Sequence, residues 1–253
     1  MQLTPIYLVI AVSALLFEAL ILWRGHRASL LRHYPFFYCY VSGVFVRNFA
    51  IFILAQRGVE NYAEIYWHSQ AAVSLLRFCV LWEVFRAVYA TLGGVRELAS
   101  RTLLPLLGCF AIMLWISSPT VPPHESYFTT FERTVSLTQA CALLGILGLA
   151  LYYGIRLGIN IWGMAFGFSL YLSVSVINHT AFEMLEFYVL IWRFISPASF
   201  VGMLILWTWA LWSYAPNPLL TPTDPSNGQE RLRQWQRAWS RIVITLRKVT
   251  GYG

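Results

Sequence analysis

The chain has 253 residues, of which 58% are hydrophobic and only 11% are charged, and its mean hydropathy is +0.60. Soluble domains carry about 25% charged residues, so this composition excludes an ordinary soluble protein and also a disordered one. The net charge of +7 comes from 18 basic and 11 acidic residues, and we expect it to reflect membrane topology rather than nucleic-acid binding.

Seven apolar segments are long enough to cross a membrane as helices. A membrane-spanning helix needs about 20 predominantly apolar residues, and clusters of charged residues or proline separate the segments. They are residues 5–23, 35–55, 66–89, 102–118, 128–152, 160–180 and 194–213. Pro5, Pro35, Pro105 and Pro197 lie near segment starts, where a helix needs no backbone N–H. The sequence therefore predicts an all-α transmembrane domain of seven helices over residues 1–213.

The segments that connect these helices differ in charge. Alternate connections, at 24–34, 86–101 and 153–159 and in the tail from 214, hold thirteen basic and three acidic residues. The opposite connections hold two basic and five acidic residues. Because basic residues are retained on the cytoplasmic side, this asymmetry predicts an external N-terminus and a cytoplasmic C-terminus. We expect a multi-pass protein of the cell membrane, which in a prokaryote is the cytoplasmic membrane.

Small residues inside the segments predict close helix packing. Gly154-x3-Gly158 and Gly163-x3-Gly167 have a spacing that allows two helices to approach closely. The four cysteines lie in apolar runs without a CxxC spacing, so we interpret them as small core residues and not as disulfides or metal ligands. They are Cys39, Cys79, Cys109 and Cys141.

The region after the seventh segment divides into a proline-rich linker, 214–228, and a cytoplasmic amphipathic helix and tail, 229–253. Apolar residues recur there at steps of three and four, and arginines occupy the opposite face. We expect this helix to lie in the membrane interface on anionic lipid. The residues predicted to contact lipid are Arg233, Trp235, Arg237, Trp239 and Arg241. A helix that binds a protein partner is the alternative.

Ionisable residues inside the segments are the first functional candidates, because each costs at least about 2.5–3.5 kcal/mol at the centre of a bilayer. Three are acidic and three basic: Glu18, Arg47, Arg77, Glu83, Glu132 and Arg133. The simpler interpretation is structural, with Arg47 or Arg77 forming interhelical ion pairs with Glu18 or Glu83. The functional interpretation is a site in which Arg47, Asn48 and Arg77 hold an anionic or carbonyl-bearing ligand.

Histidines and glutamates near the external ends of the segments form a second candidate site. His179, Glu183 and Glu186 are spaced i, i+4, i+7 and therefore share one helix face, while Glu64 and His68 are four residues apart. These side chains are suitable ligands for Zn²⁺ or a similar divalent ion, which would activate water. Hydrogen bonding of the same residues to lipid headgroups or loops explains the pattern as well. A b-type haem between His68 and His179 is a further alternative.

Two membrane families offer a comparison of topology. Seven helices with an external N-terminus resemble the microbial rhodopsins, which bind retinal through a lysine on the last helix. Lys248 is the only lysine here and lies outside 194–213, which excludes covalent retinal. The helix number and the histidines resemble the seven-helix hydrolases of the ceramidase and adiponectin-receptor type, but the HxxxH of their final helix is absent. Neither resemblance assigns the chain to a family.

The sequence contains neither a nucleotide-binding loop nor a GxSxG nucleophile motif. We therefore expect a non-enzymatic binding, sensory or accessory membrane protein with a polar intramembrane site. Its expected partners are lipid and either other membrane proteins or a second copy of the chain. Two alternatives remain open. One is a metal-assisted membrane hydrolase with an outer-face His/Glu site, and the other is a small-molecule transporter that uses Arg47 and Arg77. The pattern identifies neither a cofactor nor a substrate.

Overall fold

The computed structural model describes residues 5–57, 62–89, 124–152, 155, 157–184 and 189–215. Helices are the only regular secondary structure in these ranges, as the all-α prediction requires. They are α1 (Pro5–Arg27), α2 (Leu30–His33), α3 (Pro35–Arg57), α4 (Tyr62–Val88), α6 (His124–Tyr152), α7 (Ile159–Met184) and α8 (Val189–Ala210). Six of the seven predicted segments coincide with a long helix. Segment 102–118 lies outside the described residues.

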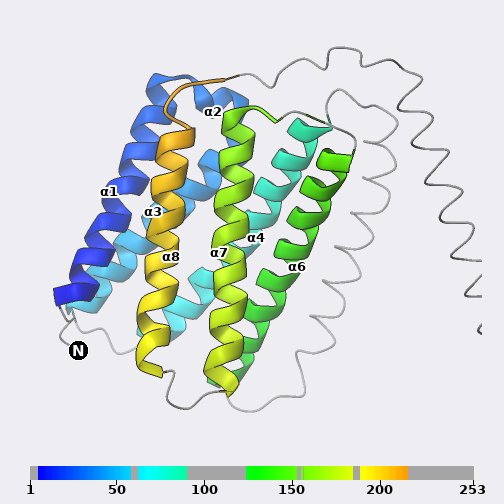
Figure 1. The fold of residues 1–253 in the computed structure, drawn as a ribbon. Helices are drawn as coiled ribbons and strands as arrows, with labels where there is room; N and C mark the ends of the chain where they lie inside the picture. The colour runs from blue at the N-terminus through cyan, green and yellow to red at the C-terminus, as the bar shows by residue number, and fades with distance from the viewer. Residues whose placement is uncertain are drawn as a thin grey trace, which may run out of the picture.

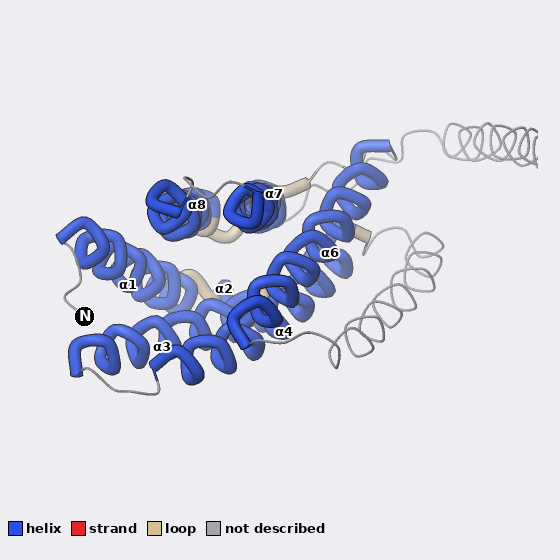
Figure 2. Tube along the Cα trace, turned by 90° about the horizontal axis from the view of Figure 1, so that it is seen from below, coloured by secondary structure: helices blue, strands red, loops and turns tan. Residues whose placement is uncertain are grey.

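The long helices stand side by side and form a closed ring (Figure 1). Seen from one end, α1, α3, α4 and α6 follow one another in a curved row, and α7 and α8 lie on its open side (Figure 2). Each neighbouring pair is in contact, including α6 with α7 and α8 with α1, so the ring closes. Polar side chains that point into this ring are therefore surrounded by helices on all sides.

Within the described residues, four helices are long and apolar enough to cross a membrane by length and composition. The spans are Ile6–Arg27, Pro35–Arg57, Phe131–Leu151 and Ile159–Asn178, and Phe194–Ala210 is a shorter apolar helix. Large apolar side chains cover the outside of the bundle, among them Leu16, Val46, Leu75, Leu151 and Ile177. Such a surface is unfavourable in water and favourable in lipid, so the described residues have the character of a membrane-embedded bundle.

An aromatic cluster fills one part of the ring interior. Trp207 of α8 is fully buried, and its ring centroid lies 4.8 Å from that of Phe37, 4.7 Å from that of Phe168 and 6.2 Å from that of Tyr40. All three pairs have the edge-to-face geometry that aromatic quadrupoles favour. This cluster joins α3, α7 and α8 across the bundle.

The contact between α7 and α8 depends on glycine. A Cβ atom on Gly163 would lie 2.1 Å from the Cβ of Ala210, and one on Gly167 would lie 2.4 Å from Nε1 of Trp207. Neither position has room for a side chain, so both glycines are required for the two backbones to approach. This is the close packing that the Gly163-x3-Gly167 spacing predicts.

The prediction for Pro197 was wrong. Pro5 and Pro35 are the first residues of α1 and α3, but Pro197 lies inside α8, which begins at Val189. A proline in a helix interior loses one backbone hydrogen bond, and in an aqueous helix this usually ends the element. Apolar membrane helices continue through proline because the surrounding helices compensate and a non-helical backbone in lipid costs more.

Candidate functional site

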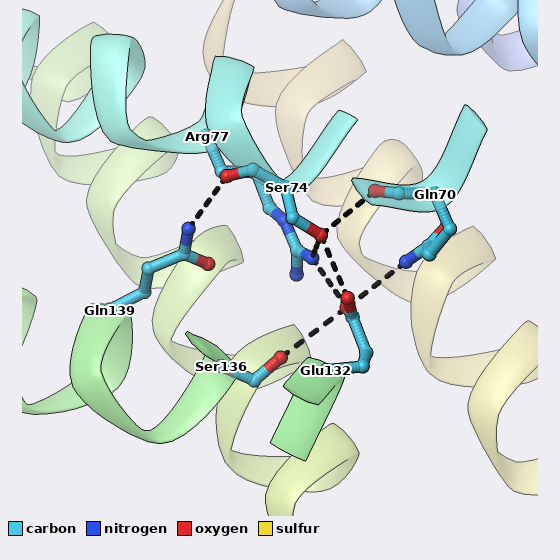
Figure 3. A network of polar contacts seen from close by, with 6 residues as sticks. All are labelled: Gln70, Ser74, Arg77, Glu132, Ser136 and Gln139. Carbon is cyan, nitrogen blue, oxygen red and sulfur yellow. Dashed lines mark hydrogen bonds and ion pairs between the residues drawn. The ribbon is translucent and has the colours of Figure 1, made fainter. Parts of the chain in front are cut away.

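A buried ion pair between α4 and α6 forms the centre of the polar interior. Arg77 of α4 is 1% exposed and Glu132 of α6 is 4% exposed. The Nη2 atom of Arg77 donates to Oε1 of Glu132 and to Oγ of Ser74 (Figure 3). The long arginine side chain points toward the N-terminal end of its helix, which brings the guanidinium to the level of Ser74.

Glu132 receives hydrogen bonds on both of its oxygens. Oε1 also accepts from Nε2 of Gln70 at 3.0 Å and from Oγ of Ser136 at 3.5 Å, and Oε2 accepts from Oγ of Ser74 at 2.7 Å. With Arg77, four side chains donate to this carboxylate (Figure 3). Hydrogen bonds to the charged form stabilise it, so Glu132 is well suited to remain ionised inside the bundle.

Gln139 completes this network but leaves polar atoms without partners. Its Nε2 donates to the carbonyl of Ser74 at 2.9 Å. Oε1 of Gln139 and both Nε and Nη1 of Arg77 are buried and have no hydrogen-bond partner among the described residues. Each buried unsatisfied group costs about 1–3 kcal/mol, so this concentration of them on two facing side chains is unusual.

A second polar network connects α1, α3 and α4. Glu18 is 0% exposed, and its Oε1 accepts from Nδ2 of Asn48 at 2.6 Å. Arg47 donates to Oδ1 of Asn48 at 3.1 Å and to Oγ of Ser69 at 3.3 Å, and its guanidinium lies 4.7 Å from the ring centre of Tyr66. Oε2 of Glu18 and Nη2 of Arg47 lack a partner within the described part of the chain.

Two buried tyrosines interact with charged residues of both networks. Tyr40 of α3 interacts electrostatically with Glu18, Arg47 and Arg77. Tyr171 of α7 interacts with Arg47, Arg77 and Glu132. The two networks therefore belong to one polar region in the ring interior, to which α1, α3, α4, α6 and α7 all contribute. Its two arginines and two glutamates balance in formal charge.

The structure corrects the predicted ion pairs. Arg77 pairs with Glu132, and not with Glu18 or Glu83, because α4 packs against α6 as well as α3. Glu83 instead caps α3: its oxygens accept from the backbone N–H groups of Phe36 at 3.2 Å and Phe37 at 2.7 Å. These N–H groups have no partner within their own helix, so a carboxylate from α4 satisfies them. Glu83 thus acts as a structural cap and not as part of the polar region.

Four residues of the network around Arg77 and Glu132 were not predicted from the sequence, although a signal was present: Gln70, Ser74, Ser136 and Gln139. Gln70, Ser74 and Arg77 are spaced i, i+4, i+7 on α4, and Glu132, Ser136 and Gln139 have the same spacing on α6. That spacing places each set on one helix face. Two matching polar stripes on apolar helices predict an interhelical hydrogen-bonded network. Arg47, Asn48 and Glu18 were predicted together, and the structure does bring them together.

The predicted metal and lipid sites lie mostly outside the described residues. This applies to the side chains of Glu64, His179, Glu183 and Glu186, whereas His68 is described and exposed. Within the described ranges, no three His, Cys, Asp or Glu residues form a group that would hold a metal ion. The predicted interfacial residues also fall outside the description: Arg233, Trp235, Arg237, Trp239 and Arg241.

Comparison with known proteins identifies no relative. No family model, no curated protein and no solved structure matches the chain.

Proposed function

We propose that this chain is a non-enzymatic binding, sensory or accessory membrane protein whose ligand site is the polar region around Arg77. Seven helices cross the membrane, with the N-terminus outside and the C-terminus in the cytoplasm. Four helices of suitable length and the uneven distribution of arginine between alternate connections support this topology. The seventh span is residues 102–118, for which sequence is the only support.

One observation carries the proposal of a ligand site. Arg77 is buried inside the ring, yet two of its three guanidinium nitrogens have no hydrogen-bond partner in the described residues. A buried ion pair offsets the cost of its desolvation only when further hydrogen bonds satisfy the remaining N–H groups. In a purely structural pair we would therefore expect the protein itself to provide the partners of all three guanidinium nitrogens. The unfilled N–H groups of Arg77 and the unfilled oxygen of Gln139 are the features of a site whose partner is a bound molecule.

The end of α8 supports an interfacial position for the tail. Nε of Arg24 donates to the carbonyl of Trp212 at 2.5 Å, and the guanidinium lies 4.9 Å from the centre of a Trp212 ring. Asn160 holds the same segment through the carbonyls of Ala210 and Ser213, each at 2.8 Å, and the N–H of Ala215 at 2.6 Å. The linker therefore starts beside the C-terminal end of α1. We propose that residues 229–253 lie from there along anionic lipid, with membrane proteins or a second copy as further partners.

Identification of co-purifying molecules tests the ligand site. Wild-type protein and Arg77→Leu are purified from the same membranes, and bound small molecules are identified by mass spectrometry. We expect a molecule retained by wild type and lost from the variant. Arg32→Leu is the matched control, because Arg32 is an exposed arginine outside the polar region. If Arg77→Leu does not fold, Gln139→Leu replaces it and leaves the ion pair intact. An unchanged amount of the same molecules in folded Arg77→Leu, or in Gln139→Leu where that variant replaces it, would refute the proposal.

A further inference from the structure

We infer that the ligand of this site is uncharged and that one head group both accepts a hydrogen bond from Arg77 and donates one to Gln139, as an amide or an alcohol does. The inference rests on the proposed ligand site and specifies its chemistry. The sequence suggests an anionic or carbonyl-bearing ligand, and this inference excludes the anionic class. The charge of the site and the direction of its free hydrogen bonds both support this chemistry.

The charge of Arg77 is already balanced. Glu132 neutralises it and is held ionised by four donors. An anionic ligand would therefore add an uncompensated negative charge to a buried region, and a cationic ligand would add an uncompensated positive one. Either charge is strongly unfavourable in a low-dielectric interior, whereas an uncharged ligand leaves the balance unchanged.

The unfilled atoms define the direction of the hydrogen bonds. The carbonyl of Ser74 can only accept, so the amide nitrogen of Gln139 must face it and the amide oxygen is the atom that is left free. In the view of Figure 3 this oxygen points toward the guanidinium of Arg77, whose free atoms can only donate. A ligand that only accepts, such as a ketone or an ester, would satisfy Arg77 and leave Gln139 unpaired. Only a group with both functions satisfies both residues.

Three probes of nearly the same shape separate these cases. Hexanamide carries a carbonyl and an N–H donor, 2-heptanone replaces the NH₂ group by CH₃, and hexanoate replaces it by a charged oxygen. Binding of each to the full chain in lipid nanodiscs is measured by isothermal titration. Nanodiscs that contain the Arg77→Leu variant measure how much of each probe partitions into the lipid alone. We expect saturable binding of hexanamide, at least about tenfold tighter than that of 2-heptanone or hexanoate, since one buried hydrogen bond is worth about that factor.

The Gln139→Leu variant tests the contribution of the acceptor oxygen of Gln139. This variant keeps the ion pair of Arg77 and removes the acceptor, so the preference for hexanamide over 2-heptanone should disappear while binding of 2-heptanone is retained. Leu137→Ala is the control, because Leu137 is an exposed residue of the same helix. The wild-type comparison of three probes needs no variant and decides the question even if Gln139→Leu fails to fold.

Each other outcome contradicts the inference in a distinct way. Equal affinities for hexanamide and 2-heptanone would show that the N–H donor of the ligand does not contribute to binding. Tightest binding of hexanoate that depends on Arg77 would leave the ligand site standing and refute its uncharged chemistry. No saturable binding of any probe would mean that ordered water fills these positions, and the co-purification experiment then decides the ligand site by itself.

Discussion

Arg77 and Glu132 share one ion pair but differ in how fully they are satisfied. Glu132 accepts from four side chains on two helices, whereas two of the three guanidinium nitrogens of Arg77 have no partner in the described residues. The acid is thus held in one position by the protein alone. The base is held through Nη2 alone, and its Nε and Nη1 atoms are buried without a partner in the described residues.

Replacing Glu132 by Gln should destabilise the bundle strongly. The charge of Arg77 would remain buried without its counter-ion, and breaking a buried pair in this way costs about 3–5 kcal/mol. Unfolding in detergent should therefore occur at clearly lower temperature. The double variant Arg77→Met, Glu132→Leu should recover much of the loss, because it removes both charges. Additive losses in the double variant would contradict the assignment of these two residues as a pair.

Replacing Glu83 by Ala should weaken the start of α3. The backbone N–H groups of Phe36 and Phe37 would lose their acceptors, and loss of a helix cap costs about 0.5–2 kcal/mol. Glu83→Gln retains one acceptor oxygen and should fall between wild type and Glu83→Ala in denaturant-induced unfolding. If the Gln variant were as unstable as the Ala variant, the charge of Glu83 and not its capping bonds would be the important feature.

Removing Asn48 and Glu18 together should cost less than the sum of the two single losses. In Asn48→Leu, Oε1 of the fully buried Glu18 loses its donor, and an orphaned buried acceptor costs about 1–3 kcal/mol, more when it is charged. In the double variant Glu18→Leu, Asn48→Leu that acceptor is absent. Thermal unfolding of the two single variants and the double variant gives the coupling energy. A coupling energy near zero would be inconsistent with the contact between them.

Adding one methyl group at Gly163 should separate α7 from α8. The new Cβ of Gly163→Ala would lie 2.1 Å from the Cβ of Ala210, so a helix must shift, at a cost of about 1–3 kcal/mol. Gly148→Ala in α6 is the matched control, since nothing lies within 4 Å of the added atom. The control should be neutral or slightly stabilising, because alanine favours helix more than glycine does. Equal unfolding temperatures for the two variants would disprove the close approach at Gly163.

The all-helical class of the protein and most helix positions follow from the pattern of apolar residues. Long apolar runs can satisfy their backbone groups in lipid only as helices, so segments such as 35–55 predict elements such as Pro35–Arg57 closely. The sequence also identified Arg77, Arg47 and Glu18, because ionisable residues are conspicuous in apolar segments. The interior of α8 was less predictable, because the effect of Pro197 depends on the helices that surround it.

Which of these residues meet depends on how the helices pack against one another. Periodicity gives the face of a helix on which a residue lies, but not which neighbour that face contacts. Because α4 lies between α3 and α6 in the ring, Arg77 could face either helix. The rotation of α4 in the bundle places its side chain against Glu132 of α6. The same packing turned Glu83 to the first N–H groups of α3 and left Gln139 beside the unfilled nitrogens of Arg77. Partner choice between helices is a property of their rotation and order, which no single segment of sequence encodes.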